Sequence, residues 1–168
     1  MSRFDSTDQR IQRCSERIAD YPKQLATLNR LAYHVQKRAQ DRFCAALKQY
    51  DMTTVGYVAL MILYGSEGER LRASELGEAC SEKPANMTRI CNELAARNLI
   101  SRRNSSDDRR GVVIALTAAG RKLAETLSPA YLAIVKQTYD GISAASLKQH
   151  ERILRRQLDN LSDQVGGS

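Results

Sequence analysis

The sequence predicts a mainly α-helical protein with one small β-hairpin, an α+β fold class, built as one domain with helical extensions. Three observations support this prediction. Long segments space their apolar residues at helical intervals, one pair of short segments alternates apolar and polar residues, and cap residues separate the helical segments. At 168 residues the chain is long enough to bury a core.

The first third of the chain is expected to be helical. Residues 1–22 are polar and are interpreted as an N-terminal arm, and residues 23–50 repeat apolar side chains at helical spacing. Thr53 or Thr54 can cap the next helix, TTVGYVALMILYG. Because this helix is apolar nearly all round, it is expected to be central and buried.

The middle of the chain shows two short helical segments after a short strand at Leu71 and Arg72. In the second segment, SEKPANMTRICNELAARNLI, Ser81 can serve as the N-cap. Pro84 fits the first helical turn, where its missing N–H is harmless. Met87, Ile90, Cys91 and Leu94 share the side of this helix that is expected to pack on the domain.

Two alternating segments, residues 99–103 and 112–116, are predicted to pair as a hairpin with residues 104–111 as its turn. The order of helix, short helix, helix and hairpin is that of a winged helix-turn-helix. In such a fold the second helix of the pair enters the DNA major groove and the hairpin contacts the backbone or the minor groove.

The C-terminal third is expected to hold two more helices. Thr117 can cap the first, Pro129 should kink or interrupt it, and Gly141 should end it. Ser143 starts the last helix, whose apolar stripe has little core of its own chain left to cover it. We therefore expect a homodimer. The stripe consists of Leu147, Leu154, Leu158, Leu161 and Val165.

Charge points to a polyanionic partner. Lys and Arg number 26 against 19 Asp and Glu, which gives a net charge of +7 and a pI of about 9.4. Seven basic but only two acidic residues lie between Arg97 and Lys122. Such a concentration of positive charge favours nucleic acid, although a basic balance can also serve solubility alone.

Other protein classes are disfavoured. There is neither a membrane-length apolar run nor a signal region, so a cytosolic protein without membrane contact is expected. The four cysteines form no CxxC pair, and His34 and His150 are the only histidines, so neither a metal site nor any cofactor is expected. We find no nucleophile–base pair and no phosphate-binding glycine loop, and therefore predict that the protein is not an enzyme.

Candidate DNA-binding residues lie on the exposed side of the second short helix and on the hairpin. Asn86 could contact adenine, and Arg89 could contact guanine or a phosphate, although any surface helix shows a solvated face. The full predicted set is Ser81, Lys83, Pro84, Ala85, Asn86, Thr88, Arg89, Asn92, Arg102, Arg103, Asp108, Arg109 and Arg110.

The hairpin stretch SRRNSSDDRRGVVIALT mixes opposite charges. Asp107 and Asp108 can pair with an arginine and hold its guanidinium in one fixed orientation. A guanidinium held in this way suits a narrow minor groove, whose negative potential attracts it. Arg102 and Arg103, at the base of the hairpin, can bind phosphates. The alternative is an exposed cluster of ion pairs, each worth about 0–1 kcal/mol.

A family resemblance adds to this interpretation. DRRGVVIALTAAG, residues 108–120, matches the pattern D-x-R-x-x-x-[VI]-x-L-T-x-x-G of the MarR family of bacterial transcriptional regulators. The preceding SELGEACSEKPANMTRICNELAARNLISR resembles that family's helix-turn-helix, and the resemblance extends over about residues 25–161. The helix-turn-helix stretch and the N-terminal arm are most similar to the EmrR (MprA) branch, which represses multidrug efflux genes.

The resemblance implies a homodimeric repressor on a pseudo-palindromic operator in double-stranded DNA, controlling efflux or stress-resistance genes. Residues 23–50 and 118–165 would be dimerisation helices around a DNA-binding part at residues 51–117. Asp108 and Arg110 match the wing residues of the family motif, with Arg110 as the minor-groove side chain. Many members leave DNA when a small phenolic or other aromatic acid lodges between the DNA-binding lobe and the dimerisation helices.

Candidate ligand-binding residues could form a half-aromatic, half-basic cleft for such an acid, although Tyr and Met at helical spacing are usually core. They are Arg30, Tyr33, His34 and Lys37 on one helix and Tyr57, Met61 and Tyr64 on the next. Two alternatives stay open. Oxidation of Cys80 or Cys91 could make the protein a thiol redox sensor on the same scaffold, or a winged helix could act as a protein adaptor without DNA.

Overall fold

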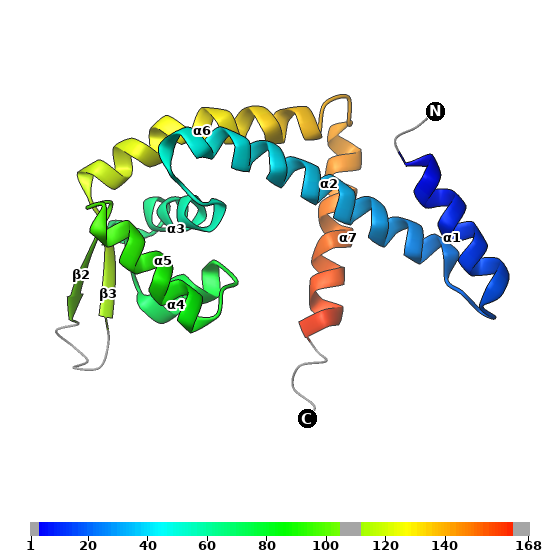
Figure 1. Cartoon of the computed structure of the whole chain (residues 1–168), viewed down its shortest axis with the longest axis horizontal. Helices are drawn as coiled ribbons and strands as arrows, with labels where there is room; N and C mark the ends of the chain where they lie inside the picture. The colour runs from blue at the N-terminus through cyan, green and yellow to red at the C-terminus, as the bar shows by residue number, and fades with distance from the viewer. Residues whose placement is uncertain (1–3, 105–111, 163–168) are drawn as a thin grey trace. The chain divides into compact units, whose positions relative to one another are not determined.

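The computed structural model describes residues 4–104 and 112–162 and confirms the mainly helical α+β fold (Figure 1). Single 3-10 turns at Lys48–Tyr50 and Glu67–Glu69 join some of the elements. The elements are α1 (Asp5–Arg17), α2 (Lys23–Leu47), α3 (Thr54–Tyr64), β1 (Arg70–Arg72), α4 (Ala73–Ala79), α5 (Pro84–Ala96), β2 (Ile100–Asn104), β3 (Val112–Leu116), α6 (Ala118–Thr138) and α7 (Ala144–Ser162).

The chain divides into two compact units, with Ile134 the last residue of the first and Val135 the first residue of the second. The predicted boundary at residue 117 is not a boundary in packing, because Ala124 and Leu127 of α6 are buried in the core of the first unit. The predicted division into an arm, dimerisation helices and a DNA-binding part concerns function and stays a prediction.

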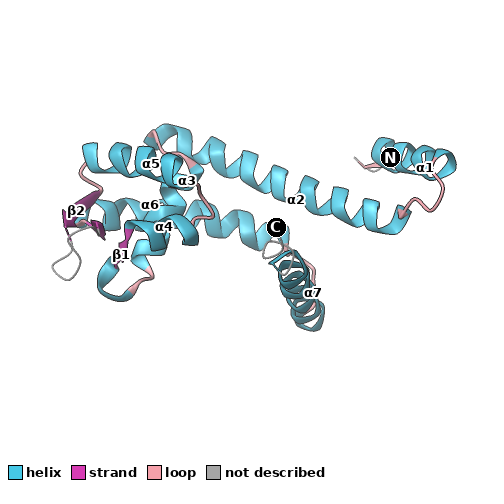
Figure 2. Ribbon diagram, turned by 90° about the horizontal axis from the view of Figure 1, so that it is seen from below, coloured by secondary structure: helices cyan, strands magenta, loops and turns pink. Residues whose placement is uncertain are grey.

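The three strands form one antiparallel sheet in the order β1–β3–β2. The sheet lies beside α4 and α5, and Figure 2 shows β1 near α4. The predicted hairpin is confirmed, with Arg102 opposite Ile114 in the register of β2 and β3. The short strand predicted at Leu71 and Arg72 also forms, and Leu71 pairs with Ile114 from the other side. β3 is therefore the central strand, and Ile114 is only 1% exposed.

The core of the first unit is built around α3, as its apolar sequence predicts. Tyr57 lies edge-on to Phe43 of α2, with 4.8 Å between the ring centroids, and Phe43 is 5.3 Å from Tyr131 of α6. The exception is Tyr64, the last residue of α3, which is 40% exposed. The largest fully buried side chains are Leu47, Leu60, Leu63, Leu76, Ile90, Ile114, Leu127 and Cys91.

Three predicted N-caps are confirmed. The Thr53 hydroxyl accepts the Gly56 N–H at 3.0 Å and opens α3, and the Thr117 hydroxyl accepts the Gly120 N–H at 3.0 Å and opens α6. At the start of α7 the Ser143 hydroxyl accepts the backbone N–H of Ser146 at 3.2 Å. Each cap satisfies a backbone donor that the first helical turn leaves without a partner.

The predicted N-cap role of Ser81 is wrong. Ser81 has a φ of 55° and closes α4, because its N–H donates to the Glu78 carbonyl at 2.9 Å while the Glu82 N–H donates to the Gly77 carbonyl at 2.9 Å. This is the Schellman arrangement of a helix C-terminus. Helix α5 begins at Pro84, in the first turn as predicted, and Lys83 is its N-cap residue.

The C-terminal helices form where the sequence predicts them. α6 continues through Pro129 without interruption, and Gly141, with a φ of 73°, lies in the turn before α7. Along α7, Leu158 and Leu161 are 65% and 69% exposed, and Val165 of the predicted stripe lies outside the described residues. No helix of the described ranges is long and apolar enough to cross a membrane.

Candidate nucleic-acid interface

Helix α5 has the two sides that its sequence predicts. Met87, Ile90, Cys91 and Leu94 are buried, each 2–3% exposed. Their contact with the core fixes the helix on the domain. The opposite side carries exposed Ala85, Thr88, Arg89 and Asn92, with half-buried Asn86 among them.

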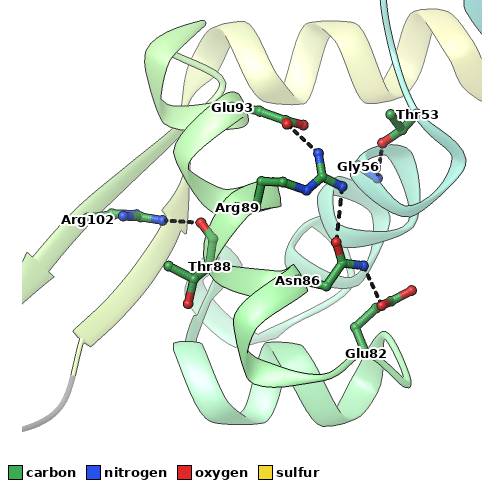
Figure 3. A network of polar contacts seen from close by, with 8 residues as sticks. All are labelled: Thr53, Gly56, Glu82, Asn86, Thr88, Arg89, Glu93 and Arg102. Atoms are coloured by element: carbon green, nitrogen blue, oxygen red, sulfur yellow. Dashed lines mark hydrogen bonds and ion pairs between the residues drawn. The ribbon is translucent and has the colours of Figure 1, made fainter.

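The polar side of α5 forms a chain of contacts that links four side chains (Figure 3). Asn86 Nδ2 donates to Glu82 Oε2 at 2.6 Å, and Arg89 Nη2 donates to Asn86 Oδ1 at 3.0 Å. Arg89 Nη1 forms an ion pair with Glu93, four residues further along the helix. The two side chains predicted to read bases are therefore both bonded within the protein.

Arg102 joins the hairpin of β2 and β3, which is the predicted wing, to α5. From β2 its guanidinium donates through Nη1 to Asn92 Oδ1 at 2.6 Å and through Nη2 to the Thr88 carbonyl at 3.3 Å (Figure 3 draws the second bond). Two predicted DNA-binding residues, Arg102 and Asn92, thus contact each other. Arg103 is exposed, and its neighbouring position on the strand directs it to the other face of the sheet.

The remaining predicted DNA-binding residues are near the start of α5 or on the wing turn. Ser81, Lys83 and Pro84 are exposed, and the Thr88 hydroxyl donates back to the Pro84 carbonyl at 2.9 Å. The predicted wing-tip residues Asp108, Arg109 and Arg110 lie outside the described residues.

Sequence reasoning missed the structural role of Arg97. Its guanidinium donates to the carbonyls of Asp51 at 2.5 Å and Tyr50 at 2.8 Å, and so ties the end of α5 to the turn before α3. No sequence signal points to this contact, because its partners are backbone atoms 46 and 47 residues away. The pairing of Arg89 with Glu93 does have a signal, since opposite charges four residues apart meet on a helix.

The predicted ligand-binding residues fall into two groups. On α2, the Arg30 guanidinium lies 5.1 Å from the centroid of the Tyr33 ring, and Arg30 Nη2 is 3.5 Å from His34 Nε2. His34 also contacts Phe4, with 5.6 Å between the ring centroids. Lys37 is paired with Asp41, which raises the pKa of the Lys37 ammonium.

The second group packs against α6. The Tyr57 hydroxyl lies 3.3 Å from Ser128 Oγ, Ser128 Oγ lies 3.5 Å from Met61 Sδ, and the Tyr64 hydroxyl donates to Glu125 at 3.2 Å. Tyr57 contacts α2 at Phe43, 13 residues beyond Arg30, which is about 20 Å along a helix. One chain therefore does not bring Arg30 and Tyr57 together.

The two candidate redox cysteines are poorly placed for reaction. Burial raises the pKa of the Cys80 thiol to about 11, with smaller contributions from Cys91 and Glu82. Burial also raises the pKa of the Cys91 thiol, against a lowering effect of Arg102, and Cys91 Sγ contacts Met87 Sδ at 3.6 Å. Because the thiolate is the reactive form, these environments disfavour thiol sensing.

We expect Cys80 to be labelled by iodoacetamide at pH 7.5 roughly 100 times more slowly than free cysteine, because its thiolate fraction falls tenfold for each unit by which the pKa is raised. The rate should climb steadily as the pH approaches 11. Timed labelling between pH 7 and 11 with peptide-level mass spectrometry measures this. Rapid labelling that levels off near pH 8 would contradict the buried environment and favour the redox alternative.

Comparisons with known proteins agree with this geometry. The family model "Transcriptional regulator SarA/Rot" matches residues 42–127. The transcriptional repressor MprA of Escherichia coli is 30% identical over 160 residues, which cover 95% of this chain and 91% of that protein.

Two solved structures share the fold. Sco3205, a MarR family regulator from Streptomyces coelicolor in complex with DNA, has a TM-score of 0.76 at 23% identity, covering 83% of this chain and 87% of that one. BpsR of Bordetella bronchiseptica, whose DNA binding is regulated by 6-hydroxynicotinic acid, has a TM-score of 0.69 at 24% identity. The match covers 78% of this chain and 92% of that one. Together with the similarity to MprA over nearly the whole length, these matches show that the chain belongs to the MarR family of transcriptional regulators.

Proposed function

We propose that the protein is a dimeric transcriptional repressor that binds a pseudo-palindromic operator and leaves it when a small aromatic or phenolic acid binds. One observation carries the DNA-binding part. Helix α5 is fixed on the core by its buried side and carries exposed Arg89 and half-buried Asn86 on its opposite side, beside the wing strands. Asn suits adenine and Arg suits guanine in the major groove.

The surroundings of α5 support this proposal. A four-residue turn, residues 80–83, separates α4 from α5, as in a helix-turn-helix. Arg102 holds the wing strand to the helix, so that both can approach DNA as one surface. The excess of basic residues between Arg97 and Lys122 suits the phosphate backbone of DNA.

A dimer is proposed because apolar side chains outside the core remain exposed on two long helices. On α2, Leu25 and Leu28 are 66% and 53% exposed, and on α7, Leu158 and Leu161 are more than 60% exposed. Two copies would place two α5 helices on half-sites about 34 Å apart, one turn of B-form DNA.

Two observations support the effector part. BpsR shows that one protein of this fold is regulated by an aromatic acid. The predicted ligand residues form two clusters within one chain, so a site that uses both needs helices from two chains. Such a site would couple ligand binding to the geometry of the dimer. Control of efflux or stress-resistance genes, and a cytoplasmic location, belong to the same proposal, and the similarity to the transcriptional repressor MprA supports its repressor part.

The DNA-binding part is tested with Arg89→Ala. Because a bidentate Arg–guanine contact contributes about 1–3 kcal/mol, we expect the affinity for the DNA upstream of the protein's own gene to fall at least about fivefold. Fluorescence anisotropy with that DNA and with a shuffled duplex at fixed salt measures the change.

Arg155→Ala is the matched control, since Arg155 is an exposed arginine that is also paired with a glutamate four residues away, here Glu151 on α7. It should leave the DNA affinity unchanged while size-exclusion chromatography confirms the same oligomeric state. Equal affinities for Arg89→Ala and wild type would exclude α5 as the reading helix. A wild type that does not prefer its own upstream DNA would favour a protein adaptor instead.

A further inference from the structure

Both side chains proposed to read bases are already bonded to carboxylates of their own chain. We propose that Glu82 and Glu93 determine the sequence specificity of α5 by holding Asn86 and Arg89 in bonds that a matched base pair replaces and a lone phosphate does not. This inference rests on the proposed binding of DNA by α5. Glu82 and Glu93 are positioning residues, because they act through Asn86 and Arg89 (Figure 3).

Both polar atoms of the Asn86 side-chain amide form hydrogen bonds within the protein. Its nitrogen donates to Glu82 at 2.6 Å, and its oxygen accepts from Arg89 at 3.0 Å. A bidentate contact with adenine needs the same two atoms, one as donor and one as acceptor. Adenine replaces both bonds at once, whereas a phosphate offers only acceptors and can replace one of them.

The guanidinium of Arg89 is held in a similar way, by Glu93 and by Asn86. Arg89 and Glu93 have side chains 58% and 49% exposed, so their ion pair is weak and can be exchanged. Guanine presents two acceptors in the plane of the guanidinium. A single phosphate would only replace the Glu93 carboxylate as the anion that pairs with Arg89. The displaced carboxylate would then lie close to the negative backbone of DNA.

Glu82 and Glu93 place negative charge beside a region of the chain that is rich in basic residues. Asn86, Arg89 and Glu93 follow one another at steps of three and four, which puts them on one side of α5, and Glu82 lies in the turn just before the helix. A surface that served only to attract DNA would carry no acidic residues there. Here Glu82 and Glu93 are each bonded to a proposed reading side chain.

The test measures discrimination rather than affinity alone. Wild-type protein first enriches a duplex from a random pool, and dissociation constants are then measured for that duplex and for a shuffled duplex of equal composition. For Glu93→Gln we expect the discrimination between the two duplexes to fall about threefold or more, mainly through tighter binding of the shuffled duplex. The salt slope on the shuffled duplex should steepen by about 0.9 for each arginine that gains a phosphate.

A double-mutant cycle separates this mechanism from a general effect of charge. In an Arg89→Ala background, Glu93→Gln should leave discrimination unchanged, because the residue through which it acts is gone. Glu151→Gln is the matched control, since it removes the same charge from an i,i+4 pair on α7. With size-exclusion chromatography confirming an unchanged oligomeric state, it should not alter discrimination. Glu82→Ala provides a second variant that acts through Asn86, because it removes the oxygen that accepts from the Asn86 amide, and thermal melting checks the fold of each protein.

The outcomes distinguish this inference from the proposed function. If wild type enriches a duplex and both Glu93→Gln and Glu82→Ala keep its discrimination, the inference is overturned alone. If the effect of Glu93→Gln persists without Arg89, the inference is also overturned. Simple repulsion between the Glu93 carboxylate and DNA would then explain the effect. If wild type enriches no sequence at all, the proposed function fails and the inference fails with it.

Discussion

Replacing Leu154 and Leu158 together with glutamate is expected to convert the protein to a monomer and to lower its affinity for the operator at least about a hundredfold. None of the described residues of α7 is buried, and Leu154 and Leu158 are 41% and 65% exposed. Burial of each such side chain in a dimer contributes about 1.5–3 kcal/mol, which two carboxylates would reverse. A monomer then engages one half-site instead of two.

Sedimentation equilibrium and anisotropy on the enriched duplex measure the two effects together. Gln149→Glu with Asn160→Asp adds the same charge on the other side of α7 and should keep both the dimer and the affinity. A variant that stays dimeric after both leucine changes would show that the α7 stripe is not part of the interface, and would leave α2 as the candidate dimer contact.

Gly120→Ala is expected to lower the free energy of unfolding by about 3 kcal/mol, the upper end of the usual cost of overpacking. A Cβ at this position would lie 2.0 Å from the carbonyl oxygen of Leu99. That oxygen cannot easily move, because it accepts the Thr117 N–H at 3.1 Å and the Thr117 hydroxyl at 3.0 Å. The added methyl group would therefore push β2 away from the start of α6.

Urea unfolding at a fixed protein concentration measures this cost, since a dimer's stability depends on concentration. Gly65→Ala is the matched control: its Cβ would lie 3.5 Å from the Met61 carbonyl, an ordinary contact, and its effect should stay within about 0.5 kcal/mol. Equal stability of Gly120→Ala and wild type would mean that the junction of β2 and α6 adjusts at little cost.

Local sequence signals predicted most of the fold. Thr53, Thr117 and Ser143 open helices because a hydroxyl at an N-cap needs only its own neighbours. The T-x-x-G part of the MarR pattern has a direct cause as well, since Thr117 caps α6 and Gly120 makes room for the Leu99 carbonyl.

The errors and omissions have physical reasons. Ser81 looked like an N-cap, but a serine three residues before a proline can equally close the preceding helix, and the Schellman bonds of α4 decide between the two. Pro129 does not interrupt α6, although proline removes one helical N–H donor. The contacts of Arg97 and Arg102 cross between elements, so no local pattern reveals them.

The candidate site was predicted in composition but not in its internal bonding. The residues of α5 lie on the predicted sides of the helix, yet the sequence did not indicate that Asn86 and Arg89 already bond each other. The ligand residues were grouped by type on adjacent helices, and such grouping ignores distance along a helix. Thirteen residues separate Arg30 from Phe43, and that spacing keeps the two clusters apart.

The bonds of Arg97 have a mechanical consequence. They fasten the last turn of α5 to the backbone at Tyr50 and Asp51, directly after the end of α2. The 25 residues of α2 span about 37 Å, so a tilt of about 5° moves its far end by about 3 Å. A molecule that shifts the N-terminal end of α2 can therefore rotate α5 out of the proposed alignment with the DNA groove without touching any side chain proposed to face a base.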